Sequence, residues 1–103
     1  TCSSPCRLMP QLTSVDRAPD ESFFQTTPEE QRALLDALTA ARESLQEEFS
    51  PDGFNIGLNE GEAAGQTVAH CHWHVIPRYD GDVLDPRGGV RWVVPQRADY
   101  WGR

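Results

Sequence analysis

The chain has 103 residues, of which 38% are hydrophobic, and a formal net charge of −7 at pH 7. This length allows one small domain, and the negative charge argues against a general nucleic-acid or membrane-surface binder. No apolar run reaches the length of a membrane span, and no charged start leads into the apolar core of a signal peptide. Three cysteines imply no complete disulfide framework, so we expect a reducing, cytoplasmic location.

The charge is unevenly distributed along the chain. Residues 1–62 carry 12 acidic residues and four arginines, whereas residues 63–103 carry four acidic residues and five arginines. The second part also contains all three histidines. It is therefore the part that can better accept an anionic ligand.

Residues 1–22 are rich in Ser, Pro and Asp and show no sustained period, so the sequence predicts an irregular N-terminal segment, followed by one domain over 23–103. A helix is predicted over 27–48. Thr27 and Glu30 form a capping box around Pro28 at the first helical position. The run Ser50-Pro51-Asp52-Gly53 ends the helix. An apolar stripe recurs at helical spacing: Leu34, Leu38, Ala41, Leu45 and Phe49.

Two strands are predicted after this helix. Apolar and polar residues alternate over 54–59 and again over 70–76, which is typical of half-buried strands. The connection over 60–69 is too long for a tight hairpin, and a long loop of this kind is a functional candidate. A further short strand is expected over 90–95. The fold class is therefore α+β, a small antiparallel sheet packed against one main helix.

The three histidines stand at alternate positions, His70, His72 and His74. Side chains alternate in direction along a strand, so the imidazoles should share one face, and Cys71 and Trp73 should point into the core. A neutral imidazole can be a nucleophile, a proton carrier or a metal ligand. The spacing alone does not decide between a metal site and acid–base chemistry.

The neighbouring residues favour a phosphate site. No Asp or Glu, the acidic ligands expected of a metal-dependent hydrolase, lies between Ala63 and Tyr79. The residues before the histidines offer an amide, a hydroxyl and several backbone N–H groups, which suit a phosphate cradle. If the two strands pair antiparallel, Asn59 lies on the histidine face. The candidate phosphate-binding residues are Asn59, Gly65, Gln66, Thr67 and Val68.

The stretch "NEGEAAGQTVAHCHWHVIPRY" resembles the signature of the histidine triad nucleotide-binding (HIT) family. The stretches "GFNIGLNEGEAAGQTV" and "GDVLDPRGGVRWVVP" are similar to its bacterial branch related to diadenosine tetraphosphate hydrolases, and "SFFQTTPEEQRALLDAL" to the helix before the signature. Together the resemblance covers residue 22 to about residue 100. Residues 1–22 depart from the family, which usually begins with additional strands.

The resemblance implies a nucleotide hydrolase or nucleotidyl transferase. His72 would attack the α-phosphate and form a covalent nucleotidyl-histidine, His70 would support the hydrogen-bond network that orients His72, and His74 would lie near the leaving group. The bond cleaved would be a phosphoanhydride or a phosphoramidate. The scheme requires no metal or other cofactor, and the family's usual form is a homodimer.

Two alternative functions are also compatible with the sequence. One is a nucleotide-binding regulatory module with little turnover. The other is a zinc-binding protein that uses the three histidines. In the preferred interpretation the partners are a small nucleotide substrate and a second copy of the chain, with no nucleic acid and no membrane.

Overall fold

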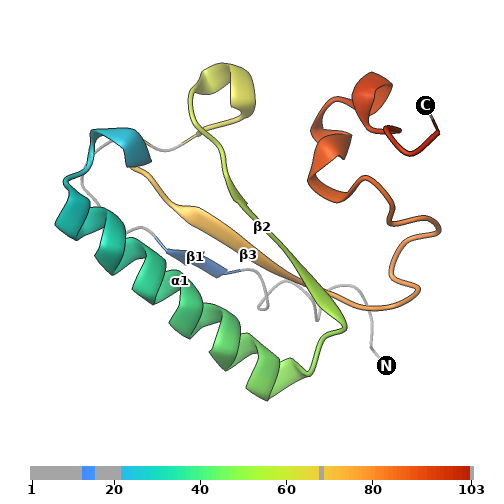
Figure 1. Cartoon of the computed structure of the whole chain (residues 1–103), viewed down its shortest axis with the longest axis horizontal. Coiled ribbons are helices and arrows are strands. Elements are labelled where there is room, and N and C mark those ends of the chain that lie inside the picture. Colours follow the sequence, from blue (N-terminus) through green and yellow to red (C-terminus); the bar gives the residue numbers. More distant parts are fainter. Residues whose placement is uncertain (1–12, 16–21, 68, 103) are drawn as a thin grey trace.

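The computed structural model describes residues 13–15, 22–67 and 69–102. The fold is α+β, as predicted: one long helix, α1 (Pro28–Phe49), lies across a three-stranded antiparallel sheet (Figure 1). The strands β1 (Thr13–Val15), β2 (Gly53–Leu58) and β3 (Trp73–Arg78) are arranged in the order β1-β3-β2, so the strand that carries His74 is central. Short 3₁₀ helices occur in the connections: η2 (Phe23–Gln25), η3 (Glu62–Ala64), η4 (Gly89–Val93) and η5 (Pro95–Arg97).

The ends of α1 follow from its capping residues. The Thr27 hydroxyl accepts the Glu30 N–H at 3.1 Å, and the Glu30 carboxylate accepts the Thr27 N–H at 2.8 Å, which satisfies two otherwise unpaired donors. At the other end Ser50 adopts a left-handed conformation (φ 49°) and donates its N–H to the Gln46 carbonyl. Pro51 follows and cannot continue the helix. The predicted helix over 27–48 is confirmed to within one residue.

The pairing of β2 with β3 separates a core face from a histidine face. Ile56 lies opposite Val75 and Leu58 opposite Trp73 on the face toward α1. Val75 is 0% exposed there, and Leu34 of α1 and Cys71 are 1% and 4% exposed. Trp73 packs on this core, edge-to-face with Phe23 at 5.6 Å between ring centroids. The next residues along each strand point to the other face, where Gly57 lies opposite His74 and Asn55 opposite Ile76.

Three elements differ from the sequence-based expectations. The strand predicted over 70–76 begins at Trp73, because both neighbours, β1 and β2, make their last pair with that residue. Within the N-terminal segment predicted to be irregular, residues 13–15 form β1. The strand predicted over 90–95 is wrong, since the chain forms η4 and η5 there. Gly88 and Gly89 have positive φ angles and Pro95 begins the second turn, and none of these suits a regular strand.

After β3 the chain turns and forms the C-terminal segment, residues 83–102, which lies beside β2 in Figure 1. The turn is held by Arg78, whose guanidinium donates two hydrogen bonds to the Asp82 carboxylate, each of 2.8 Å. Arg78 also donates to the Asn55 side chain of β2. None of the described helices combines the length and apolar character needed to cross a membrane.

Candidate functional site

The three imidazoles form a continuous row. The ring centroids of His70 and His72 are 5.8 Å apart and those of His72 and His74 are 4.9 Å apart, and both pairs meet edge to face. His74 is held by β3, while His70 and His72 lie in the extended residues just before that strand. The expected row is present, with Cys71 and Trp73 on the core side, although only one of the three histidines belongs to the strand.

One contact favours a particular tautomer of the neutral His72 ring. His72 Nδ1 lies 3.2 Å from the backbone carbonyl oxygen of His70. A carbonyl oxygen can only accept a hydrogen bond, so Nδ1 carries the proton in the neutral ring, and the lone pair is on Nε2. The acceptor belongs to the main chain of His70 rather than to its imidazole. This orientation suits a nucleophile or a metal ligand at Nε2.

Burial shifts the pKa values of His74 and Cys71 in opposite directions. Burial lowers the pKa of His74, and the neighbouring His72 lowers it further, so the neutral ring is favoured. Burial raises the pKa of the Cys71 thiol, and the charge of Glu60 adds to this effect. A thiol with a raised pKa is a poor nucleophile near neutral pH. Of the two residue types in this stretch, the histidines are therefore the reactive ones.

The loop over 59–67 is braced by its own hydrogen bonds. Gly65 donates its N–H to Glu62 O at 2.9 Å, and Gln66 donates its N–H to Gly61 O at 3.1 Å. The Gln66 side-chain oxygen accepts the Gly61 N–H at 2.7 Å. Two N–H groups expected to face a phosphate are thus engaged within the loop. Val68, also expected to bind phosphate, lies outside the described residues.

Two residues of the predicted cradle, Asn59 and Thr67, are exposed. Asn59 follows Leu58, which makes the last β2 pair with Trp73, and Asn59 lines the cavity that His74 also lines. Thr67 is exposed at the end of the loop. The neighbouring Glu60 accepts a hydrogen bond of 2.7 Å from the Ser22 hydroxyl, which fastens the start of the loop to the residues before α1. Sequence reasoning missed this contact because the two residues are far apart in the chain and neither lies in a periodic pattern.

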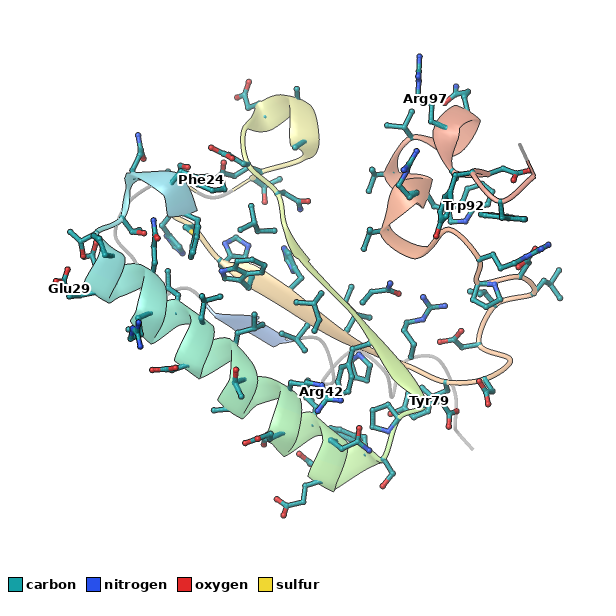
Figure 2. All side chains as sticks on the ribbon, viewed as in Figure 1. Phe24, Glu29, Arg42, Tyr79, Trp92 and Arg97 are labelled. Atoms are coloured by element: carbon teal, nitrogen blue, oxygen red, sulfur yellow. The ribbon has the colours of Figure 1, made fainter. Side chains whose placement is uncertain are left out.

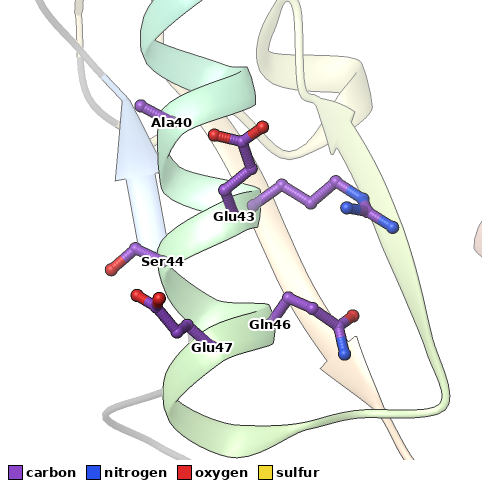
Figure 3. A pocket seen from close by; sticks show the side chains of 6 residues that line it. Ala40, Glu43, Ser44, Gln46 and Glu47 are labelled. Carbon is purple, nitrogen blue, oxygen red and sulfur yellow. The ribbon is translucent and has the colours of Figure 1, made fainter.

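An open cavity of about 1100 Å³ begins at the end of the histidine row. His74 and Ile76 of β3 line one side and residues of η4 the other. A different hollow, on the outer surface of α1, is lined by Ala40, Arg42, Glu43, Ser44, Gln46 and Glu47 (Figure 3). It contains no group that the histidines could act with, and the Arg42 guanidinium lies over the Phe54 ring at 5.0 Å. The cavity beside His74 is therefore the candidate substrate site.

A metal centre would need several His, Cys, Asp or Glu side chains around one point. Within residues 13–15, 22–67 and 69–102, no group of three or more His, Cys, Asp or Glu side chains is arranged so that it could hold a metal ion.

Comparison with known proteins agrees with this geometry. Residues 6–81 match the HIT domain family. Protein hit of Bacillus subtilis is 39% identical over 59 residues, which cover 57% of this chain and 41% of that protein. The asymmetrical bis(5'-nucleosyl)-tetraphosphatase of Schizosaccharomyces pombe is 39% identical over 56 residues, which cover 54% of this chain and 31% of that protein.

A solved structure shares the fold. The crystal structure of a member of the HIT family from Bacillus subtilis superposes with a TM-score of 0.64 at 30% identity, and the match covers 78% of this chain and 61% of that one. The matches cover less than half the length of Protein hit of Bacillus subtilis and of the Schizosaccharomyces pombe tetraphosphatase. Since the family match covers residues 6–81 and includes the histidine row, the chain belongs to the HIT domain family.

Proposed function

We propose that this protein is a nucleotide hydrolase or nucleotidyl transferase that cleaves a phosphoanhydride or phosphoramidate bond at an α-phosphate. The observation that carries the proposal is the contact between His72 Nδ1 and His70 O, since it leaves the Nε2 lone pair as the nucleophile. His72 is also the only one of the three histidines with another imidazole on each side.

The reaction proceeds in two displacements. In the first, His72 Nε2 forms a bond to the α-phosphorus, and the bond from phosphorus to the leaving-group atom breaks; its electron pair goes to that atom, which as an amine also takes up a proton from solvent. In the second, water attacks the same phosphorus and gives a proton to solvent, the N–P bond breaks with its electron pair returning to Nε2, and the nucleoside monophosphate is released with His72 restored. Dividing one difficult step into two easier ones is the gain from a covalent intermediate. No metal or other cofactor enters either step.

The phosphate contacts divide between direct and supporting roles. We assign direct contacts to Asn59 and to the hydroxyl and N–H of Thr67, with Val68 as a further backbone donor. Gly65 and Gln66 support them by holding the loop shape, because their N–H groups close turns within it. Preorganised donors of this kind stabilise the charge that develops on the phosphate oxygens.

His72→Ala is the decisive variant. We expect it to lower turnover at least several-hundred-fold, the effect of losing one group worth about 3–4 kcal/mol in the transition state. Binding of a nucleoside monophosphate should survive, because the loop and Asn59 are unchanged. The measurement is release of AMP from diadenosine tetraphosphate and from adenosine 5'-phosphoramidate, each with and without a chelator. Mass spectrometry of the wild-type protein after rapid quenching should detect an adenylyl group on His72.

Cys71→Ser is the matched control, because it alters the neighbouring nucleophilic side chain on the core face. It should retain most activity and lose about 1–3 kcal/mol of stability, since it places a hydroxyl in an apolar site. If Cys71→Ser abolishes turnover while His72→Ala retains it, the roles are reversed. Chelator-sensitive turnover would favour a zinc protein, and tight nucleotide binding without product would favour a regulatory binding module.

We further propose that the protein works in the cytoplasm as a homodimer. The odd number of cysteines supports a reducing location. The small core of a domain this size supports self-association, since a second copy would bury more apolar surface.

A further inference from the structure

On the histidine face of the sheet, β2 places a glycine and an amide beside β3. The strand register sets Gly57 opposite His74 and Asn55 opposite Ile76. All four of these residues line the cavity described above. A Cβ at Gly57 would meet no atom within 4 Å, so the space next to His74 is open. A group released past His74 can therefore extend over Gly57 toward Asn55.

The orientation of the Asn55 amide follows from its contact with Arg78, whose guanidinium donates to Asn55 Oδ1. A guanidinium has donors only, so the amide oxygen faces Arg78 and the amide nitrogen faces the opposite way. On that side lies Gly89, which also lines the cavity, and a Cβ at Gly89 would be 3.2 Å from Asn55 Nδ2. Among the described residues, nothing accepts a hydrogen bond from Nδ2. A donor group on the cavity side is thus available to a ligand.

Arg78 is itself held by Asp82. Its Nε and Nη2 donate to the two Asp82 carboxylate oxygens, each at 2.8 Å, while Nη1 donates to Asn55. Chiefly through the hydrogen bonds from Arg78, the pKa of Asp82 is lowered to about 2, so the pair stays ionised near neutral pH. Arg78 and Asp82 line a separate hollow of about 250 Å³ on the other side of Asn55 and do not line the cavity. The contribution of Arg78 to the cavity is therefore made through Asn55.

The other side-chain donors in the described lining of the cavity are engaged or assigned elsewhere. Trp92, on the C-terminal segment in Figure 2, donates its Nε1–H to the Arg87 carbonyl at 2.6 Å. Asn59 is assigned to the phosphate undergoing attack. His74 stands next to the reacting imidazole, with 4.9 Å between the ring centroids. Asn55 is therefore the side-chain donor left for the part of the substrate beyond that phosphate.

We infer that Asn55 is a specificity-determining residue of this site, whose amide NH₂ group donates a hydrogen bond to an oxygen of the leaving group, and that Arg78 is the residue that positions it. This role rests on the proposed function and adds to it the group that binds the leaving side of the substrate. A leaving group that ends at the cleaved bond, such as ammonia, does not reach Asn55. A longer one with an oxygen acceptor gains a hydrogen bond that the shorter one lacks.

The test compares two substrates on each protein preparation: diadenosine tetraphosphate, whose leaving group carries phosphate oxygens, and adenosine 5'-phosphoramidate, whose leaving group is ammonia. The readout is the ratio of their kcat/KM values for AMP release, which a general loss of folded protein does not change. Asn55→Leu has a similar size and no donor, and should lower the ratio at least tenfold, the effect of one hydrogen bond to a charged acceptor. Asn55→Asp should lower it at least as far, although its carboxylate still accepts from Arg78.

Gly57→Val tests the path between His74 and Asn55, because it fills the open space that the longer leaving group would cross. It should lower the same ratio. Gly53→Val is the matched control, since Gly53 lies on the same strand, a Cβ there also meets no atom within 4 Å, and Gly53 does not line the cavity. Its ratio should equal that of the wild-type protein, and equal losses in the two glycine variants overturn this path.

Arg78→Met tests the positioning role, because it frees the Asn55 amide to turn. It should lower the ratio by a smaller factor than Asn55→Leu, and Arg78→Lys should restore part of the loss. In the Asn55→Leu background, Arg78→Met should leave the ratio unchanged, since a positioning residue acts only through the residue that it positions. An equal effect in both backgrounds overturns the role of Arg78.

Three results overturn the role of Asn55 and leave the proposed function standing. One is an unchanged ratio in Asn55→Leu. The second is a lower ratio in Asn55→Asp alone, which would be an effect of the added charge. The third is release of AMP by the wild-type protein from the phosphoramidate alone. Failure of the wild-type protein to release AMP from either substrate overturns both the role of Asn55 and the proposed function.

Discussion

The titration of His74 is coupled to folding. Its pKa is lowered in the folded chain by burial and by His72, so on acidification the unfolded chain binds this proton first. The stabilising contribution is complete above the pKa of an unfolded histidine, about 6.5. It is lost progressively as the pH falls from there through the pKa of the folded chain.

His74→Asn should therefore flatten part of the pH dependence of stability. We expect the free energy of unfolding of the wild-type protein to fall between about pH 7.5 and about pH 5, across the unfolded histidine pKa, and that of the variant to fall less. Urea titrations at several pH values measure the free energy of unfolding of both proteins. Titratable groups that the two proteins share contribute to both curves, so the difference between the curves reports on His74. Parallel curves for the two proteins would show that His74 is not responsible.

The position of the histidine row could be predicted from the sequence, whereas the hydrogen bond that orients His72 could not. The alternation of histidines with Cys71 and Trp73 was enough to predict an imidazole row on one side and a core on the other, because side-chain direction depends only on local backbone geometry. The hydrogen bond from His72 Nδ1 to the carbonyl of His70 could not be predicted. It depends on the backbone before β3 lying outside the sheet, which is set by where β1 and β2 stop pairing.

At the element scale, α1 is the part most dependent on local chemistry. Thr27→Ala removes the hydroxyl that accepts the Glu30 N–H, and should lower the free energy of unfolding by about 1 kcal/mol. Thr39→Ala is the internal comparison, since the Thr39 hydroxyl in mid-helix bonds only to the Leu35 carbonyl. This variant should be neutral or slightly stabilising, because alanine has the higher helix propensity. Urea denaturation measures both, and equal losses would contradict the capping role.

Local sequence signals explain why α1 could be predicted and why the structure of residues 90–95 could not. The capping box and the apolar stripe specify α1 within a short window, and its bounds were predicted to within one residue. Residues 90–95 are rich in valine and tryptophan, which favours a strand by composition. No partner strand is available to them in the described chain, and Gly88, Gly89 and Pro95 impose turns. A strand requires a partner that a local pattern cannot supply.

At the scale of the whole molecule, the free edge of β2 points to self-association. β2 pairs with β3 on one side, and within the described residues no strand pairs with its other edge, beside which the C-terminal segment lies. Ile56 on this edge strand is 37% exposed. An unpaired strand edge is a template for another strand. We predict that the purified protein sediments as a dimer. Ile56→Arg should shift it toward monomer, whereas Leu35→Arg, at an exposed position of α1, should not. A wild-type protein that sediments as a monomer at all concentrations would contradict the prediction.

The C-terminal segment buries few side chains, so it should be able to detach while the sheet and α1 stay folded. Among residues 83–102, Ala98 is the only one buried, whereas the sheet and α1 share a continuous core. Detaching this segment therefore costs far less free energy than unfolding the domain, and its attached population is governed by a local equilibrium. Any ligand that fills the cavity binds only the attached form, so ligand concentration shifts that equilibrium by mass action. Cavity occupancy and attachment of the segment are therefore linked, and a ligand bound between β3 and η4 would favour the attached form.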